Sequence, residues 1–220
     1  DSLRLFMMRY SVLDTDGDYN EKTLNALRSE FIDKFCNLMI RSLSKNFSIE
    51  RALGRLQSNK LETLLNEVND EEFKNSILSV QLQINNLKND IDDDITNFDM
   101  YKATHKLFSM GPQINSLFDI YEPWKLKVKQ DDDEMTKHNK QLKQDIIIFT
   151  ALDSLRVLLL LFQSIIPQYS KMLLDRLDVD SKKRTVEYAT IASDFTYGKN
   201  TTFKKGEKVP LTKLEVPSTV

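Results

Sequence analysis

The stretch of sequence that decides the fold is ILSVQLQINNLKNDIDDDITNF, residues 77–98. Its apolar residues recur every three or four positions, as they do along one face of an α-helix; they are Ile77, Val80, Ile84, Leu87, Ile91, Ile95 and Phe98. A continuous seam of this kind is suited to packing against neighbouring helices. Three adjacent carboxylates, residues 92–94, interrupt only the outer side of the seam, so we interpret them as a solvated face and not as a metal site.

Comparable apolar stripes lie along most of the chain. They cover residues 24–38, 61–68 and 142–162, and each has the spacing of an amphipathic or buried helix. Residues 48–60, between the first two stripes, have a mixed pattern and are interpreted as a connection. The chain is therefore predicted to be built from several packed helices.

Proline and glycine mark the expected ends and irregularities of these helices. A helix over residues 99–121 should be disturbed at Gly111 and Pro112, because proline removes a backbone donor and clashes with the preceding turn. Pro167 should open another helix that ends near Leu177. Only 5 Gly and 5 Pro occur in 220 residues, which favours helices. We predict an all-α protein, an antiparallel helix bundle with an irregular C-terminal extension.

The N-terminal residues already have the pattern of an amphipathic helix, with Leu3, Phe6 and Met7 at helical spacing and no initiator methionine. We therefore expect a fragment of a longer protein. Residues 14–18 are expected to form a turn, and Asp18 or Asn20 is a candidate cap for the following helix. The turn is not expected to bind calcium, because a calcium loop needs Gly at its sixth position and Glu at its twelfth.

The composition excludes several classes of function. Thirty-one basic and 33 acidic side chains leave a formal charge of −2, so nucleic acid cannot be held by bulk charge and any such binding must be local. The single cysteine, Cys36, excludes an internal disulfide, and two histidines are too few for a usual Cys/His metal cluster. The strongest apolar run, residues 157–162, is far shorter than the ~20 residues of a membrane span. No metal, membrane or cofactor partner is expected for this chain.

Enzymatic motifs are scarce in the sequence. There is no glycine-rich phosphate loop and no Gly-x-Ser-x-Gly elbow, and no pair of carboxylates stands out as an acid and a base. We therefore expect no catalytic residues here. The residues by themselves favour a binding or assembly module.

Trp124, the only tryptophan, follows Pro123 at a point where a helix should stop. It is either a core residue that seals the end of the bundle or an exposed platform for an unpaired base. Asn37 and Arg41 lie four residues apart, on one line of a helix surface. They are either a solvated face or a pair of donors for base edges and phosphate.

These motifs, in this order, resemble the C-terminal part of methionyl-tRNA synthetase. Residues 1–6 and 16–19 resemble the Asp-Ala-Leu-Arg-Tyr-Phe segment and the Asp-Gly-Asp-Phe turn of that family, and residues 36–41 resemble its Gly-Asn-Leu-x-x-Arg. Asn115 and Asp119, ahead of residues 122–126, are similar to its Asn-x-Tyr-Ile-Asp-x-x-x-Pro-Trp signature. Residues 155–158 and the later Pro167 match its penultimate helix and the proline that follows.

The resemblance implies a division of the chain and a set of roles. Residues 1–20 correspond to a stem-contact or linker segment, residues 21–178 to the helical anticodon-binding domain and residues 179–220 to a C-terminal extension. The parent enzyme would be an ATP-dependent methionine–tRNA ligase, whose nucleotide-binding motifs are absent here, so the fragment alone should be inactive. Its partners would be the CAU anticodon loop of tRNA(Met) and the catalytic domain of the same chain.

Four site residues follow from the resemblance: Asn37, Arg41, Pro123 and Trp124. The tryptophan would stack on the first anticodon base, Asn37 and Arg41 would read the loop, and the backbone at Pro123 would help to define the pocket. Asp33 departs from the family pattern, because its charge would repel phosphate unless Arg41 or Lys34 neutralises it. In the tail, Lys204, Lys205 and Lys208 either touch phosphate or keep the segment soluble.

Two alternatives remain open at this point. The first is the anticodon-binding domain of a leucyl-, valyl-, isoleucyl- or cysteinyl-tRNA synthetase, which shares the bundle. The second is a structural scaffold module, which would bury Trp124 and show no salt-dependent affinity for RNA. The absence of an appended RNA-binding domain and the compact ending favour a mitochondrial matrix enzyme, with a cytoplasmic one as the alternative. We also expect a monomer.

Overall fold

The computed structural model describes residues 1–10, 17–199, 201 and 211. The expected turn at residues 14–18 lies partly outside this range, and the tail lysines Lys204, Lys205 and Lys208 lie wholly outside it. All regular elements of the described residues are helical, so the predicted all-α class is confirmed.

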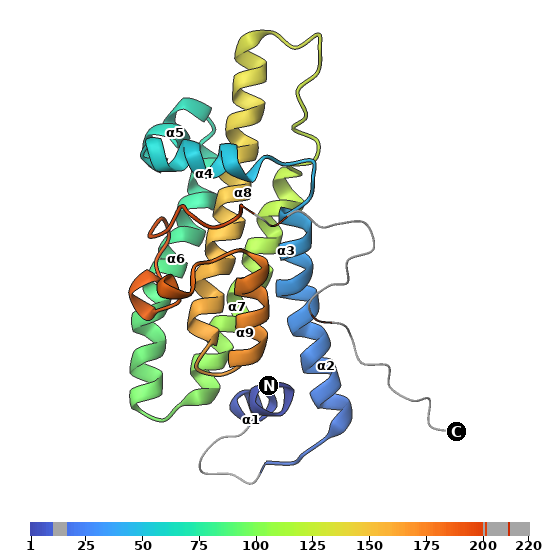
Figure 1. The fold of residues 1–220 in the computed structure, drawn as a ribbon, viewed down its shortest axis with the longest axis vertical. Helices are drawn as coiled ribbons and strands as arrows, with labels where there is room; N and C mark the ends of the chain where they lie inside the picture. The colour runs from blue at the N-terminus through green and yellow to red at the C-terminus, as the bar shows by residue number, and fades with distance from the viewer. Residues whose placement is uncertain (11–16, 200, 202–210, 212–220) are drawn as a thin grey trace, which may run out of the picture.

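The helices follow one another with short connections over most of the chain. They are α1 (Ser2–Tyr10), α2 (Glu21–Phe31), a π-helix η1 (Ile32–Cys36), α3 (Asn37–Ser42), α4 (Ile49–Ser58), α5 (Leu61–Val68), α6 (Glu71–Thr96), α7 (Met100–Tyr121), α8 (Glu134–Phe162) and α9 (Pro167–Arg176), followed by 3₁₀ turns η2 (Ser181–Lys183) and η3 (Val186–Tyr188). Figure 1 shows α6, α7 and α8 running alternately down and up the long axis of the molecule, as predicted for an antiparallel bundle.

Helix α8 is the central helix of the bundle. Every residue from Gln144 to Phe162 is buried, because α4, α6, α7 and α9 all pack against this helix. A helix that is apolar on all sides requires such enclosure. The part of α8 before Leu142 carries polar residues and extends beyond the other helices in Figure 1.

The prediction of a connection at residues 48–60 is wrong, since α4 occupies most of this range. The side chain of Ser48 accepts a hydrogen bond from the backbone N–H of Arg51 (3.3 Å) and caps the helix. Ala52, Leu53 and Leu56 form its short buried stripe. The stripe is hidden in the sequence because the three charged residues and the glycine of residues 49–58 dilute it.

Three other details of the helices differ from the prediction. In α1 the buried side chains are Leu5 and Phe6, whereas Leu3 and Met7 are exposed. Helix α7 continues through Gly111 and Pro112 without interruption, since buried residues on both sides keep it against the core. The seam of α6 is buried as far as Ile91, and Phe98 is 73% exposed. Asn20 caps α2, as expected for one of the two candidate residues.

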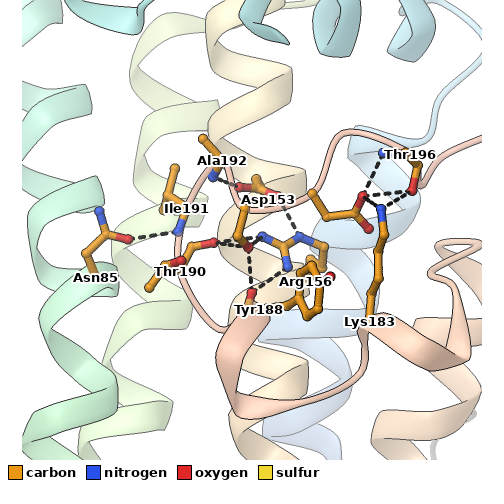
Figure 2. Close-up of polar contacts among 11 residues, drawn as sticks. Asn85, Asp153, Arg156, Lys183, Tyr188, Thr190, Ile191, Ala192 and Thr196 are labelled. Atoms are coloured by element: carbon orange, nitrogen blue, oxygen red, sulfur yellow. Dashed lines mark hydrogen bonds and ion pairs between the residues drawn. The ribbon is translucent and has the colours of Figure 1, made fainter.

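The segment after α9 is held to the bundle by a buried ion pair on α8. The Arg156 guanidinium donates to Asp153 (2.7 Å) and to the carbonyl oxygens of Tyr188 (2.7 Å) and Thr190 (2.8 Å). The second carboxylate oxygen of Asp153 accepts from the Ala192 N–H (2.6 Å). Figure 2 shows these groups converging from α8 and from the segment that follows η3.

Candidate nucleic-acid interface

The π-helix η1 sits directly before the two predicted site residues on α3. The backbone N–H of Asn37 bonds to the carbonyl of Ile32, five residues earlier, where an α-helix would use a residue four earlier. A π-turn therefore changes the direction in which the following side chains leave the helix axis, and such turns are frequent at functional sites.

Helix α7 packs unusually close to η1 at Gly111. A Cβ atom at this position would lie 3.0 Å from Cβ of Lys34 and 3.1 Å from the ring of Phe35. One turn further along α7, Asn115 donates one hydrogen bond to the carbonyl of Lys34 (2.8 Å) and one to that of Gly111 (2.8 Å). The glycine thus permits the close approach, and the asparagine amide ties the two elements together.

Arg41 on α3 lies across the gap between α3 and the end of α7. Its guanidinium donates to the Asp119 carboxylate (2.7 Å) and to Oδ1 of Asn115 (3.4 Å). The same group lies 5.3 Å from the ring centroid of Phe118 and 5.7 Å from that of Trp124, which is within the range of cation–π contacts. Two of the five N–H donors that a guanidinium carries are used in these hydrogen bonds.

Trp124 stands on a tight turn at the end of α7. The last residue of α7 is Tyr121, and the capping residue Glu122 has left-handed backbone geometry with φ of 42°. The turn is closed by a hydrogen bond from the Lys125 N–H to the Glu122 carbonyl (2.7 Å). Pro123 is buried, whereas Trp124 remains 37% exposed. A core tryptophan would be buried far more completely, so one part of the indole is open to solvent.

Asn37 lies one helical turn before Arg41 and is exposed. Its amide donates to Oδ1 of Asp33 (3.1 Å). Of the two cations named for Asp33, Lys34 pairs with Glu30 and Arg41 pairs with Asp119. The structure therefore brings Arg41, Pro123 and Trp124 together, while Asn37 stands beside them next to a carboxylate.

A polar cleft of about 310 Å³ adjoins the Trp124 turn. Its lining includes Asn46, Arg51, Lys127, Gln141 and Gln144. Sequence reasoning missed the inner two of these side chains, Arg51 and Gln144. It also missed Phe118 beneath Arg41. The sequence carried no signal for these side chains, because α4 and α8 meet the Pro-Trp turn only in the tertiary structure.

Other chemistry is not favoured at this interface. Cys36 is the buried last residue of η1, and burial raises the pKa of its thiol to about 12, so it is not a nucleophile at neutral pH. Within the part of the chain that the structure describes, no group of His, Cys, Asp and Glu residues is arranged to hold a metal ion. None of the described helices combines the length and the apolar character needed to cross a membrane.

Comparison with known proteins gives the class to which this arrangement is related. No protein-family model matches the chain. A solved methionyl-tRNA synthetase of Mycobacterium tuberculosis has the same fold, with a TM-score of 0.73 at 17% identity, over 98% of this chain and 39% of that one. The all-helical bundle is therefore one that occurs in an aminoacyl-tRNA synthetase.

The curated relatives are more specific. The chain is 34% identical over 216 residues to the mitochondrial methionine–tRNA ligase of Saccharomyces cerevisiae and 31% identical over 225 residues to that of Candida albicans. Both matches cover 97% of this chain, but it spans only 35% and 38% of those two proteins. The chain is thus homologous to a part of the mitochondrial methionyl-tRNA synthetases, which confirms the resemblance predicted from its motifs.

Proposed function

We propose that this chain binds the anticodon loop of tRNA(Met), with the CAU triplet as its target, as part of a methionine–tRNA ligase. The observation that carries the proposal is the partly open indole of Trp124 with the Arg41 guanidinium 5.7 Å from its ring. A rigid aromatic face beside a fixed cation suits an unpaired base attached to a phosphate.

Each side chain has a distinct role in this proposal. Trp124 stacks on one splayed base, for which the turn at Pro123 sets the angle of the ring. Arg41 uses donors that Asp119 and Asn115 leave open, and these two partners hold its plane in place. Asn37 contributes the carbonyl oxygen of its amide and the N–H that Asp33 does not accept. The carboxylate of Asp119 also penalises a phosphate placed directly on that side of Arg41.

The proposal is tested by titrating the chain with an RNA stem-loop that carries a CAU anticodon. Because Trp124 is the only tryptophan, its fluorescence reports on the site alone. We expect quenching on binding, an affinity that falls with salt and a loss of roughly 1–3 kcal/mol for Trp124→Ala. Arg41→Ala should relax discrimination between CAU and altered loops if Arg41 reads bases, and should weaken all loops equally if it contacts phosphate.

Tyr101→Ala provides a matched control. Tyr101 is as exposed as Trp124, at 37%, but it lies at the opposite end of α7, about 33 Å away for 22 helical residues. Its removal should leave RNA binding unchanged. If Trp124 is not quenched by the RNA, or if Trp124→Ala unfolds the chain without a separate effect on binding, the scaffold alternative takes its place.

We further propose the context in which this part operates. The whole protein would activate methionine with ATP in a separate catalytic domain of the same chain and transfer it to tRNA(Met), acting as a monomer in the mitochondrial matrix. The names of the relatives from Saccharomyces cerevisiae and Candida albicans support this reading. In this proposal the division of the chain is the one predicted above, with a stem-contact segment at 1–20, the anticodon-binding domain at 21–178 and an extension at 179–220.

A further inference from the structure

A chain of buried and part-buried polar contacts connects the Trp124 turn to α8 and α4. The side-chain amide of Gln144 on α8 donates to the carbonyl oxygen of Pro123 (2.9 Å). The amide oxygen of Gln144 accepts from the Arg51 guanidinium on α4 (3.0 Å). The carbonyl of Pro123 also accepts from the Leu126 N–H (3.3 Å), so both of its lone pairs are used within the turn.

The chemistry of the two neighbours dictates the orientation of the Gln144 amide. Arg51 can only donate, and the carbonyl of Pro123 can only accept. Hence the oxygen of the amide must face the arginine and its nitrogen must face the proline. Among the side chains of this length, glutamine matches both neighbours, since glutamate would place an acceptor against the carbonyl and methionine would offer neither an acceptor to Arg51 nor a donor to Pro123.

Arg51 is itself held firmly. Its Nε donates to both carboxylate oxygens of Asp145 (2.9 and 3.0 Å), and Arg55 contacts the same carboxylate (3.2 Å). Asp145 is buried, and two arginines on one carboxylate compensate its charge. The amide of Gln144 therefore has a fixed partner on α4, so it is not free to swing away from the turn.

We propose that Gln144 is a positioning residue for the RNA site, which sets the direction of the Trp124 ring by fixing the carbonyl of the preceding residue. The inference rests on the proposed function in its consequence for RNA binding. The other part of the proposal, that Gln144 restrains the indole of Trp124, does not depend on any ligand. Because the turn is already fixed before RNA binds, less conformational entropy of the turn and the indole is lost when a base stacks on the ring.

The experiment compares Gln144→Glu and Gln144→Met with Gln141→Glu in the full 220-residue chain. Gln144→Glu keeps a partner for Arg51 but loses the donor to Pro123, and Gln144→Met retains the volume while losing both bonds. Gln141 lies one turn earlier on α8 and lines the same cleft, so Gln141→Glu matches the charge change without touching the turn. Thermal melts by circular dichroism confirm that each variant is folded.

The first measurement is the acrylamide quenching and steady-state anisotropy of Trp124 without RNA. Both Gln144 variants should show stronger quenching and lower anisotropy than the wild type, and Gln141→Glu should not. The second is affinity for the CAU stem-loop, which should fall roughly threefold to tenfold in the Gln144 variants, the effect of one lost buried hydrogen bond. The loss should disappear when Trp124 is already alanine, because the two residues then act through one contact.

Two results would overturn the proposal. One is a folded Gln144→Met variant whose indole is as restrained as in the wild type. The other is a Gln144 effect on affinity that persists in full in the Trp124→Ala background. If Trp124→Ala itself leaves RNA binding unchanged, the proposed function fails, and the quenching data still decide whether Gln144 restrains the ring.

Discussion

The ion pair of Asp153 and Arg156 gives the most quantitative test of how this fold is held together. Both side chains are fully buried. Burial alone would lower the pKa of Arg156, but the adjacent Asp153 outweighs it and raises the pKa, so the guanidinium stays charged. The perturbation is Arg156→Met, which keeps an unbranched apolar stem and removes the charge and the guanidinium donors of Arg156 that Figure 2 shows.

The expected cost follows from what the substitution leaves behind. Removing one partner of a buried ion pair typically costs about 3–5 kcal/mol, because the other charge stays uncompensated. Without Arg156, Asp153 loses the guanidinium that compensates its charge and keeps the hydrogen bond from the Ala192 N–H (2.6 Å). The carbonyls of Tyr188 and Thr190 share the hydroxyl of Ser193, which has a single proton. We therefore expect a loss of about 3–5 kcal/mol, the range for a broken buried pair.

The assay is urea unfolding at pH 7 followed by circular dichroism, with Asp153→Leu and the double variant measured alongside. The double variant should be less destabilised than the sum of the single ones, because it leaves no isolated charge. Lys102→Met is a matched control, because Lys102 and Asp99 are also three residues apart and form a solvent-accessible ion pair (2.6 Å between Nζ and Oδ2). We expect no measurable loss of stability for this variant. A cost below about 1 kcal/mol for Arg156→Met, or strict additivity in the cycle, would refute the reasoning.

Three further predictions concern single side chains. Cys36 should resist alkylation by iodoacetamide at pH 8 in the folded chain and react in urea, as measured by mass spectrometry, because burial raises the pKa of its thiol from 9.0 to about 12. For Asp194, burial raises the pKa but hydrogen bonds from Lys183 and Thr196 outweigh it, and the pKa is lowered from 3.8. This carboxylate thus stabilises the fold above that pH, and acid titrations of Asp194→Asn should show less loss of stability below pH 3.8 than the wild type. Asn20→Ala should cost about 1 kcal/mol in urea unfolding, since Oδ1 of Asn20 caps α2 through Lys22 and Thr23; an unchanged midpoint would show that the cap is dispensable.

The local pattern of apolar residues predicted most of the helices. The stripes at 24–38, 61–68 and 142–162 all became helices, because helical periodicity depends only on neighbours along the chain. The pattern failed where few residues carry it or where a short helix is rich in charge, as in α4. It also misplaced the buried face of α1, since which side of a nine-residue helix meets the core depends on where its partners lie.

For the candidate site, the sequence supplied the residue types through their resemblance to a known order of motifs. Asn37, Arg41, Pro123 and Trp124 were named in this way, and their role in binding remains a prediction. The sequence did not indicate the π-turn before Asn37, because a π-turn is stabilised by the packing of Gly111 and Asn115 from a distant helix. Nor did it indicate Gln144, whose two partners lie on separate segments.

The sequence by itself determined the helical character of the chain, its apolar seams and its resemblance to part of a synthetase. All three depend on short-range residue patterns and on the order of motifs along the chain. Only the tertiary structure decided how far the indole of Trp124 is open, which plane Arg41 adopts and that Asp153 and Arg156 are buried together. Exposure, side-chain direction and charge compensation depend on atoms that are remote along the chain and meet only when the helices pack.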